Sequence, residues 1–171
     1  MTRVFQQSSR LCMLFFMVIS LVACGFHLRG QIIIPDSLKV ITLNSASGSN
    51  DFDRDLRIAL KKAGVTVLDK AQASADIPEL KVNAISTSDT TLATNSDNDI
   101  TQIERRLTAV YFIRNNQGKA LYGPRTVSTS KSLANQNAEE STKLAYNQQQ
   151  TEGMYEELVS QLLSDLSYSP L

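Results

Sequence analysis

The segment from Ile100 to Arg114 constrains the fold more than any other part of the chain. Apolar and polar residues alternate along most of it. The apolar set is Ile103, Leu107, Ala109, Tyr111 and Ile113, and the polar set is Gln102, Glu104, Arg106 and Thr108. Successive side chains of a β-strand point to opposite faces of its sheet. The period of two therefore predicts a long strand with one face in a core and the other outside it.

Two further extended runs flank this strand. Leu80 to about Leu92 begins with alternating apolar residues and then becomes rich in Ser and Thr, and Ala120 to about Leu133 forms the other run. The polar segments Thr94–Asp99 and Asn115–Gly118 separate the runs and have the composition of turns. Short turns between extended runs join antiparallel neighbours, so we expect a three-stranded meander.

The part of the chain before the meander predicts a strand, a helix and a second strand. Leu38–Leu43 and Val65–Leu68 are short, β-branched runs. Between them, Asn50 is expected to cap a helix that ends at Gly64. Its apolar residues recur at helical spacing and are Phe52, Leu56, Ala59, Leu60 and Ala63.

The chain closes with a second predicted helix. Met154, Leu158, Leu162 and Leu166 lie four residues apart, and the helix is strongly polar if it extends back towards Ala138. Two helices can cover only one face of a sheet. We therefore expect an α+β two-layer sandwich, with two helices packed on one face of a mostly antiparallel sheet of four or slightly more strands. The other face is expected to carry Tyr122, Thr126, Ser128, Ser130 and Ser132, which suits water or a protein partner.

Residues 1–23 have the layout of a secretory signal. Arg3 and Arg10 precede the apolar run Leu11–Val22, in which only Ser20 is polar. Twelve helical residues reach only about 18 Å, which is short of the ~30 Å hydrocarbon layer. A cleaved signal is therefore favoured over a membrane-spanning helix.

Cys24 follows Leu21-Val22-Ala23, which resembles the lipobox of bacterial lipoproteins. In that motif the thiol receives diacylglycerol and the new amino terminus is acylated after cleavage. The alternative is a buried free thiol in a plain hydrophobic helix. We expect residues 1–23 to be a lipoprotein signal, 24–35 a lipidated tether and 36–171 a single domain. Gly25 stands where aspartate favours inner-membrane retention in enteric lipoproteins, so the outer membrane is expected.

Charge and cysteine content exclude several classes of function. Removing residues 1–23 leaves 15 Lys and Arg against 17 Asp and Glu, so a nucleic-acid partner is not expected. No cysteine of the mature chain is then free for a disulfide, a thiol nucleophile or a zinc site. His27 is the only histidine, and the acidic segment Asp51–Asp55 lacks the glycine and the distant glutamate of a calcium loop. We expect no metal and no cofactor.

The residues after the lipobox resemble the LPS-assembly lipoprotein family LptE. Members begin Cys-Gly-(Trp or Phe)-His-Leu-Arg, which matches Cys24, Gly25, Phe26, His27, Leu28 and Arg29, a motif read here as tether. Weaker collinear matches follow at Lys39-Val40-Ile41, Leu56-Arg57, Gly64-Val65, Leu68-Asp69-Lys70, Pro78-Glu79-Leu80 and Met154-Tyr155. Together they extend over essentially the whole mature chain in one order.

This resemblance implies a fold like the one derived above and no catalytic residues. It implies a plug in the lumen of the outer-membrane β-barrel LptD, a role in assembling that barrel, and binding and transport of lipopolysaccharide. Cations can pair with the ligand's phosphates, so the candidate binding residues are Arg105, Arg106, Lys131 and Lys143. For each of them, the alternative is a solvated or lumen-facing charge with no ligand.

Two other functions compete with this one. The first is a stand-alone envelope lipoprotein that binds another ligand. The second is an envelope hydrolase that uses Asp51, Asp53 or Asp99, but hydrolysis of this kind needs paired carboxylates, and the spacing of these acids does not supply a pair.

The anchor assignment predicts the behaviour of Cys24→Ala. The signal should stay uncleaved by the lipoprotein route, while the domain still folds because its core does not use the cysteine. Mass spectrometry of the membrane-associated product and circular dichroism measure the two effects. An unfolded variant would place Cys24 in the core instead.

Overall fold

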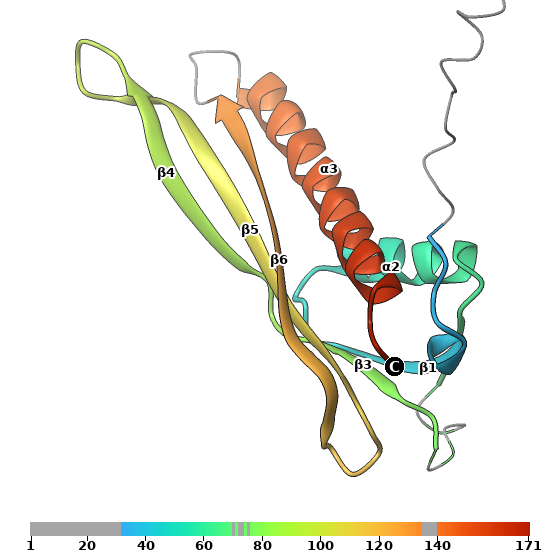
Figure 1. Ribbon diagram of the computed structural model, residues 1–171. Coiled ribbons are helices and arrows are strands. Elements are labelled where there is room, and N and C mark those ends of the chain that lie inside the picture. Colours follow the sequence, from blue (N-terminus) through green and yellow to red (C-terminus); the bar gives the residue numbers. More distant parts are fainter. Residues whose placement is uncertain (1–31, 70, 72–73, 75, 135–139) are drawn as a thin grey trace, which may run out of the picture. The chain divides into compact units, whose positions relative to one another are not determined.

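The computed structural model describes residues 32–69, 71, 74, 76–134 and 140–171. Within them, one mixed sheet of six strands is combined with two α-helices (Figure 1). The elements in chain order are η1 (Asp36–Leu38), β1 (Val40–Ser45), α2 (Asn50–Lys62), β2 (Thr66–Leu68), β3 (Glu79–Val82), β4 (Ser86–Thr94), β5 (Ile100–Arg114), β6 (Ala120–Ala134) and α3 (Glu140–Ser167).

Strand β5 organises the sheet. Strand β6 runs antiparallel to β5 along one edge, and β3 and β4 share its other edge. Strand β3 pairs with the carboxyl-terminal end of β5, as in Leu80 opposite Ile113, and β4 pairs with the amino-terminal part, as in Asp89 opposite Arg105. The predicted meander of three antiparallel strands is confirmed. Strand β1 lies parallel to both β2 and β3, so the sheet is mixed and larger than four strands.

The predicted run from Leu80 to Leu92 is divided into β3 and β4. The backbone N–H of Asn83 donates to the carbonyl of Val110, and that of Ile85 donates to the carbonyl of Ser47 in the loop before α2. The first bond continues the pairing with β5, and the second draws the chain out of the ladder before β4 begins. A local sequence pattern does not carry this break, because its partners lie more than twenty residues away in either direction.

Two element boundaries near the start also differ from expectation. The predicted strand Leu38–Leu43 begins as the 3-10 turn η1 and continues as β1 only from Val40. Helix α2 is capped by Ser49, whose hydroxyl accepts a hydrogen bond from the N–H of Phe52 at 3.3 Å. The predicted cap, Asn50, is the first helical residue instead.

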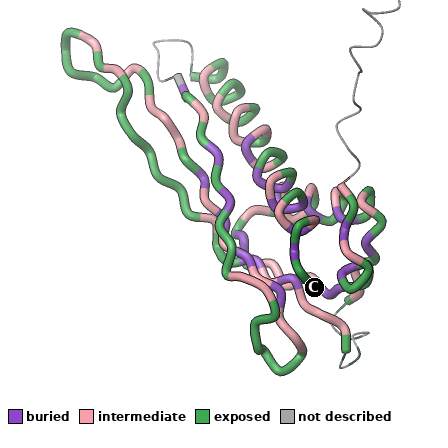
Figure 2. The backbone as a smooth tube through the Cα atoms, viewed as in Figure 1, coloured by how far each residue is buried: buried purple, intermediate pink, exposed green. Residues whose placement is uncertain are grey.

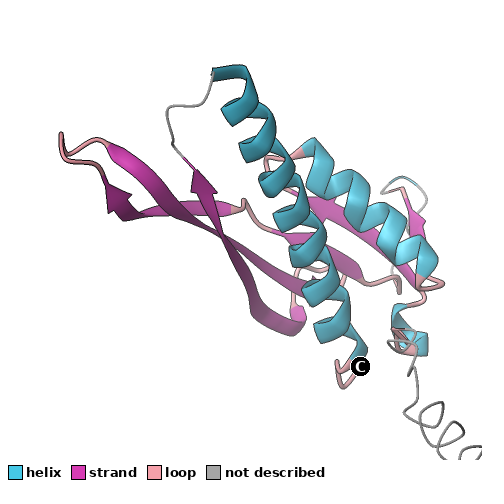
Figure 3. Ribbon diagram, turned by 90° about the horizontal axis from the view of Figure 1, so that it is seen from above, coloured by secondary structure: helices cyan, strands magenta, loops and turns pink. Residues whose placement is uncertain are grey.

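Both helices pack on the same face of the sheet, as predicted (Figure 3). A single core holds α2 side chains such as Leu56, α3 side chains such as Leu162, and the inward side chains Leu80 and Tyr111 of the sheet. All four of these side chains are fully buried. Ile34, within the range taken as tether, is also buried in this core.

The sheet continues past the core as a projecting part, formed by β4, the first half of β5 and the second half of β6. Eight of the nine residues of β4 are exposed, and purple buried positions become sparse towards the tip of the β4–β5 hairpin (Figure 2). Helix α3 also becomes more exposed towards this end, since none of its residues before Met154 is buried. The predicted polar first half of this helix is confirmed.

A register shift between β5 and β6 alters the faces of the sheet. Tyr111 pairs with Arg125, but Ile113 pairs with Tyr122, so one extra residue is accommodated in β6. Tyr122 therefore packs against the core, and the prediction that it lies on the open face is wrong. Gly123 lies in this bulge at φ +90°.

We expect Gly123→Ala to destabilise the protein. A Cβ at this position would lie 2.9 Å from the Cβ of Phe112 and 3.0 Å from the carbonyl oxygen of Tyr111. Gly118→Ala is the matched control, because Gly118 has φ +80° and no atom within 4 Å of an added Cβ. Urea unfolding should show Gly123→Ala losing about 2 kcal/mol more stability than Gly118→Ala. Equal losses would mean that the bulge relaxes freely.

Candidate functional site: the projecting strands and the face of helix α3 beside them

The face of the projecting strands that points away from the helices, here called the open face, is lined with hydroxyls. Its members are Ser86, Ser88 and Thr90 of β4, Thr108 of β5, and Thr126, Ser128, Ser130 and Ser132 of β6. Gln102 donates to Ser132 at 2.5 Å, and Ser130 donates to Glu104 at 3.1 Å. Apart from Tyr122, the predicted polar face is confirmed.

The two neighbouring arginines of β5 point to opposite faces. Arg105 faces the helix side and forms two hydrogen bonds to the carboxylate of Asp89, at 2.8 and 2.7 Å. This contact raises the pKa of Arg105 and lowers the pKa of Asp89. Arg106 is exposed on the open face, between Ser88 and Ser130. Of these two candidate cations, only Arg106 is available to an external anion without first breaking an ion pair.

Lys131 lies against helix α3. A Cβ added to Gly153 would stand 2.8 Å from the Lys131 ammonium, so the absence of a side chain in the middle of the helix makes room for this cation. Two residues before Lys131 in β6, Thr129 is buried, and its hydroxyl donates a hydrogen bond to the carboxylate of Glu157 in α3 at 2.7 Å. Strand β6 and helix α3 therefore meet through polar groups above the core.

Lys143 lies in the first turns of α3. Its side chain is 23% exposed, and its ammonium is 3.8 Å from the carboxylate of Glu140. One turn further on, the side-chain oxygen of Asn147 is buried without a hydrogen-bond partner among the described residues. Three of the four candidate cations, Arg105, Lys131 and Lys143, are thus held on the helix side or on the helix itself. Their role in binding stays a prediction.

Asp165 joins the end of α3 to the sheet. Its carboxylate accepts from the hydroxyl of Tyr111 at 2.7 Å and from Arg125 at 2.8 and 2.7 Å. The hydrogen bonds from Arg125 and Tyr111 lower the pKa of Asp165, while burial and the bond to Asp165 raise the pKa of Tyr111. The guanidinium of Arg125 also lies 5.7 Å from the ring centre of Tyr122. This cluster fixes the bulge of β6 onto the helix.

Sequence reasoning did not find the Asp165 cluster. It placed Tyr111 in the core, which is confirmed, but singled out neither Arg125 nor Asp165. The two lie 40 positions apart. The only available signal was an acid two residues before the end of an amphipathic helix, beside apolar neighbours, which is weak by itself.

The remaining sequence candidates have structural roles or lie outside the described residues. Asp53 accepts from the hydroxyls of Ser45 and Ser47 at 2.6 and 2.8 Å, and Asp51 pairs with Arg54. No group of three or more His, Cys, Asp or Glu side chains within the described ranges could hold a metal ion. Cys24 and the motif residues 25–29 are not among the residues described.

None of the helices in the described part of the chain has the length and hydrophobicity that crossing a bilayer requires.

Residues 38–166 match the sequence profile of LptE, the lipopolysaccharide-assembly family. The match covers all six strands, α2, α3 except Ser167, and the last residue of η1. This chain belongs to the LptE family. The motif at residues 24–29 lies outside this match and stays a prediction, whereas the open face and the Asp165 cluster lie within the matched residues.

Two curated relatives agree with this membership, and a solved structure shares the fold. The LPS-assembly lipoprotein LptE of Photorhabdus laumondii is 37% identical over 38% of this chain and 35% of its own length. That of Pectobacterium atrosepticum is 31% identical over 53% of this chain and 49% of its own length. The aligned part thus spans half or less of these relatives. A minor lipoprotein from Acinetobacter baumannii has the same fold, with a TM-score of 0.64, 22% identity, and coverage of 76% of this chain and 91% of that one.

The Asp165 cluster predicts a pH-dependent contribution to stability. Because the folded-state pKa of Asp165 lies below its ordinary value of 3.8, the contribution is present above that value and is lost as the pH falls below it. Asp165→Asn should cost about 1–2 kcal/mol at neutral pH, because Tyr111 then donates to a neutral acceptor. Urea unfolding at several pH values should show the difference from the parent chain shrinking below about pH 4.

Asp97→Asn is the control for this measurement, because Asp97 lies in the exposed turn between β4 and β5. It should leave stability unchanged across the range. A difference between Asp165→Asn and the parent that stays constant down to pH 2 would contradict the assignment of a lowered pKa.

Proposed function

We propose that this chain is an outer-membrane lipoprotein, anchored through Cys24 with residues 1–23 removed, that occupies the lumen of an LptD-like β-barrel and takes part in lipopolysaccharide transport to the cell surface. Membership of the lipopolysaccharide-assembly family carries the proposal. The names of the two curated relatives, both LPS-assembly lipoproteins, support it. The role is one of binding and assembly and includes no catalytic step.

The open face supports the same proposal on physical grounds. The interior wall of a large outer-membrane barrel is polar, so a plug needs a rigid surface that exchanges hydrogen bonds with it. Hydroxyls lose less free energy on leaving water than charged groups do. The open face supplies Ser and Thr hydroxyls from three strands. On the part of β5 that lies between β4 and β6, its only full charges are Glu104 and Arg106. It is therefore a polar surface of low charge, as a plug in such a lumen needs.

Within this function, the four candidate cations differ in how accessible they are to a lipopolysaccharide phosphate. Arg106 is exposed and has no ion pair within the described residues, so it can contact a phosphate directly. Lys131 is partly buried beside α3, Lys143 is partly buried on α3 itself, and Arg105 is held by Asp89. Arg106 is therefore the first of the four to test for phosphate binding.

A stand-alone envelope lipoprotein with another ligand is the second candidate. An exposed hydroxyl face also suits a soluble partner, so the face by itself does not separate the two. Depletion of the protein does, because only the proposed function predicts a loss of lipopolysaccharide from the cell surface.

Co-purification with the barrel tests the proposal directly. The affinity-tagged chain, extracted from envelopes in detergent at native expression, should bring down a large outer-membrane β-barrel protein. Ser128→Trp, which adds bulk at the centre of the open face, should weaken binding to the barrel about fivefold or more, since a misfitted side chain in an interface costs about 1–3 kcal/mol. Ser128→Thr keeps the hydroxyl and should recover the barrel normally.

Recovery of the parent chain alone as a free monomer would overturn the proposal. Recovery of the barrel with Ser128→Trp at the parental level would keep the function but remove the open face from the interface. In both variants, circular dichroism checks that the domain is folded.

A further inference from the structure

Helix α2 presents one row of cations and an isoleucine to solvent. The row is Arg54, Arg57, Ile58, Lys61 and Lys62, whose spacings of three, four, seven and eight residues from Arg54 place them on one face. All five residues are exposed, and Ile58 is 45% exposed. The opposite face is buried in the core through Phe52, Leu56 and Leu60. The row is therefore the surface that α2 offers to a partner.

The charge of this row is uncompensated towards the carboxyl-terminal end of α2. Arg54 pairs with Asp51 at 2.7 Å and with Asp55 at 3.3 Å. Arg57, Lys61 and Lys62 have no ion pair among the residues that the structure describes. Three positive charges and one exposed isoleucine thus stand together, with the acids of the helix confined to its first half.

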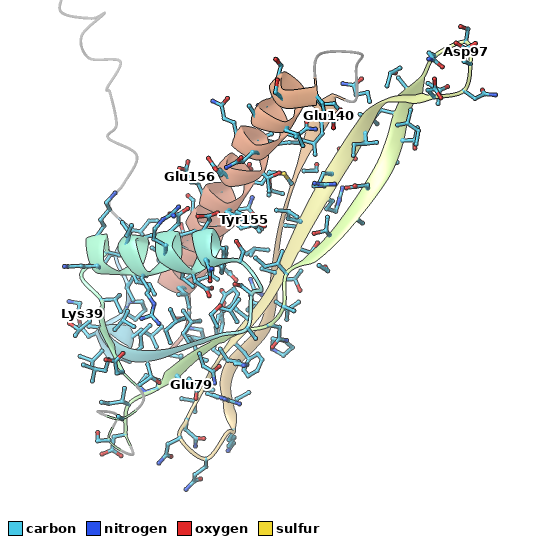
Figure 4. All side chains as sticks on the ribbon, turned by 180° about the vertical axis from the view of Figure 1, so that it is seen from behind. Lys39, Glu79, Asp97, Glu140, Tyr155 and Glu156 are labelled. Carbon is cyan, nitrogen blue, oxygen red and sulfur yellow. The ribbon has the colours of Figure 1, made fainter. Side chains whose placement is uncertain are left out.

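This end of α2 lies where the chain enters the domain. The N–H of Thr66, four residues after Lys62, donates to the carbonyl of Lys39 at 2.7 Å, next to η1. Figure 4 shows Lys39 at this end, with Asp97 of the β4–β5 hairpin at the far end of the projecting strands. Two further apolar residues here are solvent-exposed, Ile33 at 77% and Val40 at 42%.

The length of the tether limits how far this end can move from the anchor. Ile32 follows Cys24 by eight residues, which reach at most about 28 Å when fully extended. An acylated Cys24 is held at the bilayer surface, so the entry end of the domain stays within that distance of the lipid headgroups. Such confinement gives the cations a high effective concentration of any anionic lipid in the same leaflet.

From this charge, exposure and tether length we infer that the α2 row is a docking surface for anionic phospholipid headgroups of the leaflet that holds the anchor. The inference rests on the lipid anchor of the proposed function. Arg57, Lys61 and Lys62 contact the headgroup phosphates, and Ile58 enters the interfacial region between them.

A fluorophore at residue 58 tests the inference in the lipidated full-length mature protein. The thiol of Cys24 is blocked by its lipid, so Ile58→Cys provides a single labelling site. The protein is reconstituted into vesicles of phosphatidylcholine, with or without phosphatidylglycerol, and quenched with acrylamide, which is neutral. The label should be protected only where phosphatidylglycerol is present, and high salt should reverse the protection. The control label is Ser128→Cys on the open face, which should stay accessible in both vesicles.

Charge variants make the test specific. Each cation near an anionic surface contributes about fivefold in binding, so Lys61→Gln with Lys62→Gln should lower the ratio of docked to free domain about 25-fold. Glutamine keeps the helix propensity. Lys119→Gln removes one positive charge in the exposed turn between β5 and β6 and should leave protection unchanged, whereas Lys61→Gln alone should lower the ratio about fivefold.

The inference is overturned by equal accessibility of residue 58 in both vesicles, by protection that survives Lys61→Gln with Lys62→Gln, or by protection that appears only when lipopolysaccharide is added. Failure here is distinguishable from failure of the proposed function. In the former case, the parent chain and the α2 variant still co-purify with the barrel, and in the latter neither does.

Discussion

The pairing of β5 along its whole length is the interaction on which the rest of the structure depends. Its carboxyl-terminal end lies in the core, where Tyr111 and Ile113 are fully buried, and its amino-terminal half supports β4 outside the core. Strand β6 accompanies it throughout. The projecting strands have little apolar burial of their own, so the continuous backbone ladder of β5 supplies their order.

The packing of the domain changes from apolar to polar along helix α3, and the two parts have different roles. From Met154 to Leu166, helix α3 contributes to a closed core, and Asp165 joins the end of the helix to the bulge of β6. Near Met154 the packing becomes polar, since Thr129 donates to Glu157 and the Lys131 ammonium lies over Gly153, while the open face carries hydroxyls. Stability is concentrated in the first part, and the surfaces available to partners are concentrated in the second.

Local patterns predicted the parts of the fold that local patterns determine. The period of two in β5 and the four-residue spacing of Met154 to Leu166 gave those elements and their buried faces. The break between β3 and β4 depends on a hydrogen bond to Ser47, and the face of Tyr122 depends on a bulge, so neither is present in the local sequence. The alternation of side chains along β5 places Arg105 and Arg106 on opposite faces of the sheet. That Asp89 is the partner of Arg105 depends on the register between β4 and β5, which the local sequence does not show.

Gly153 has a consequence for the motion of helix α3. A glycine within a helix weakens it by about 1 kcal/mol relative to alanine, and this one stands immediately before the first buried residue, Met154. No residue of α3 before Met154 is buried, so unwinding those turns exposes little apolar surface of the helix itself, and that segment opens at a lower free energy than the core does. Residues 140–152 can therefore fray and re-form repeatedly while the domain remains folded.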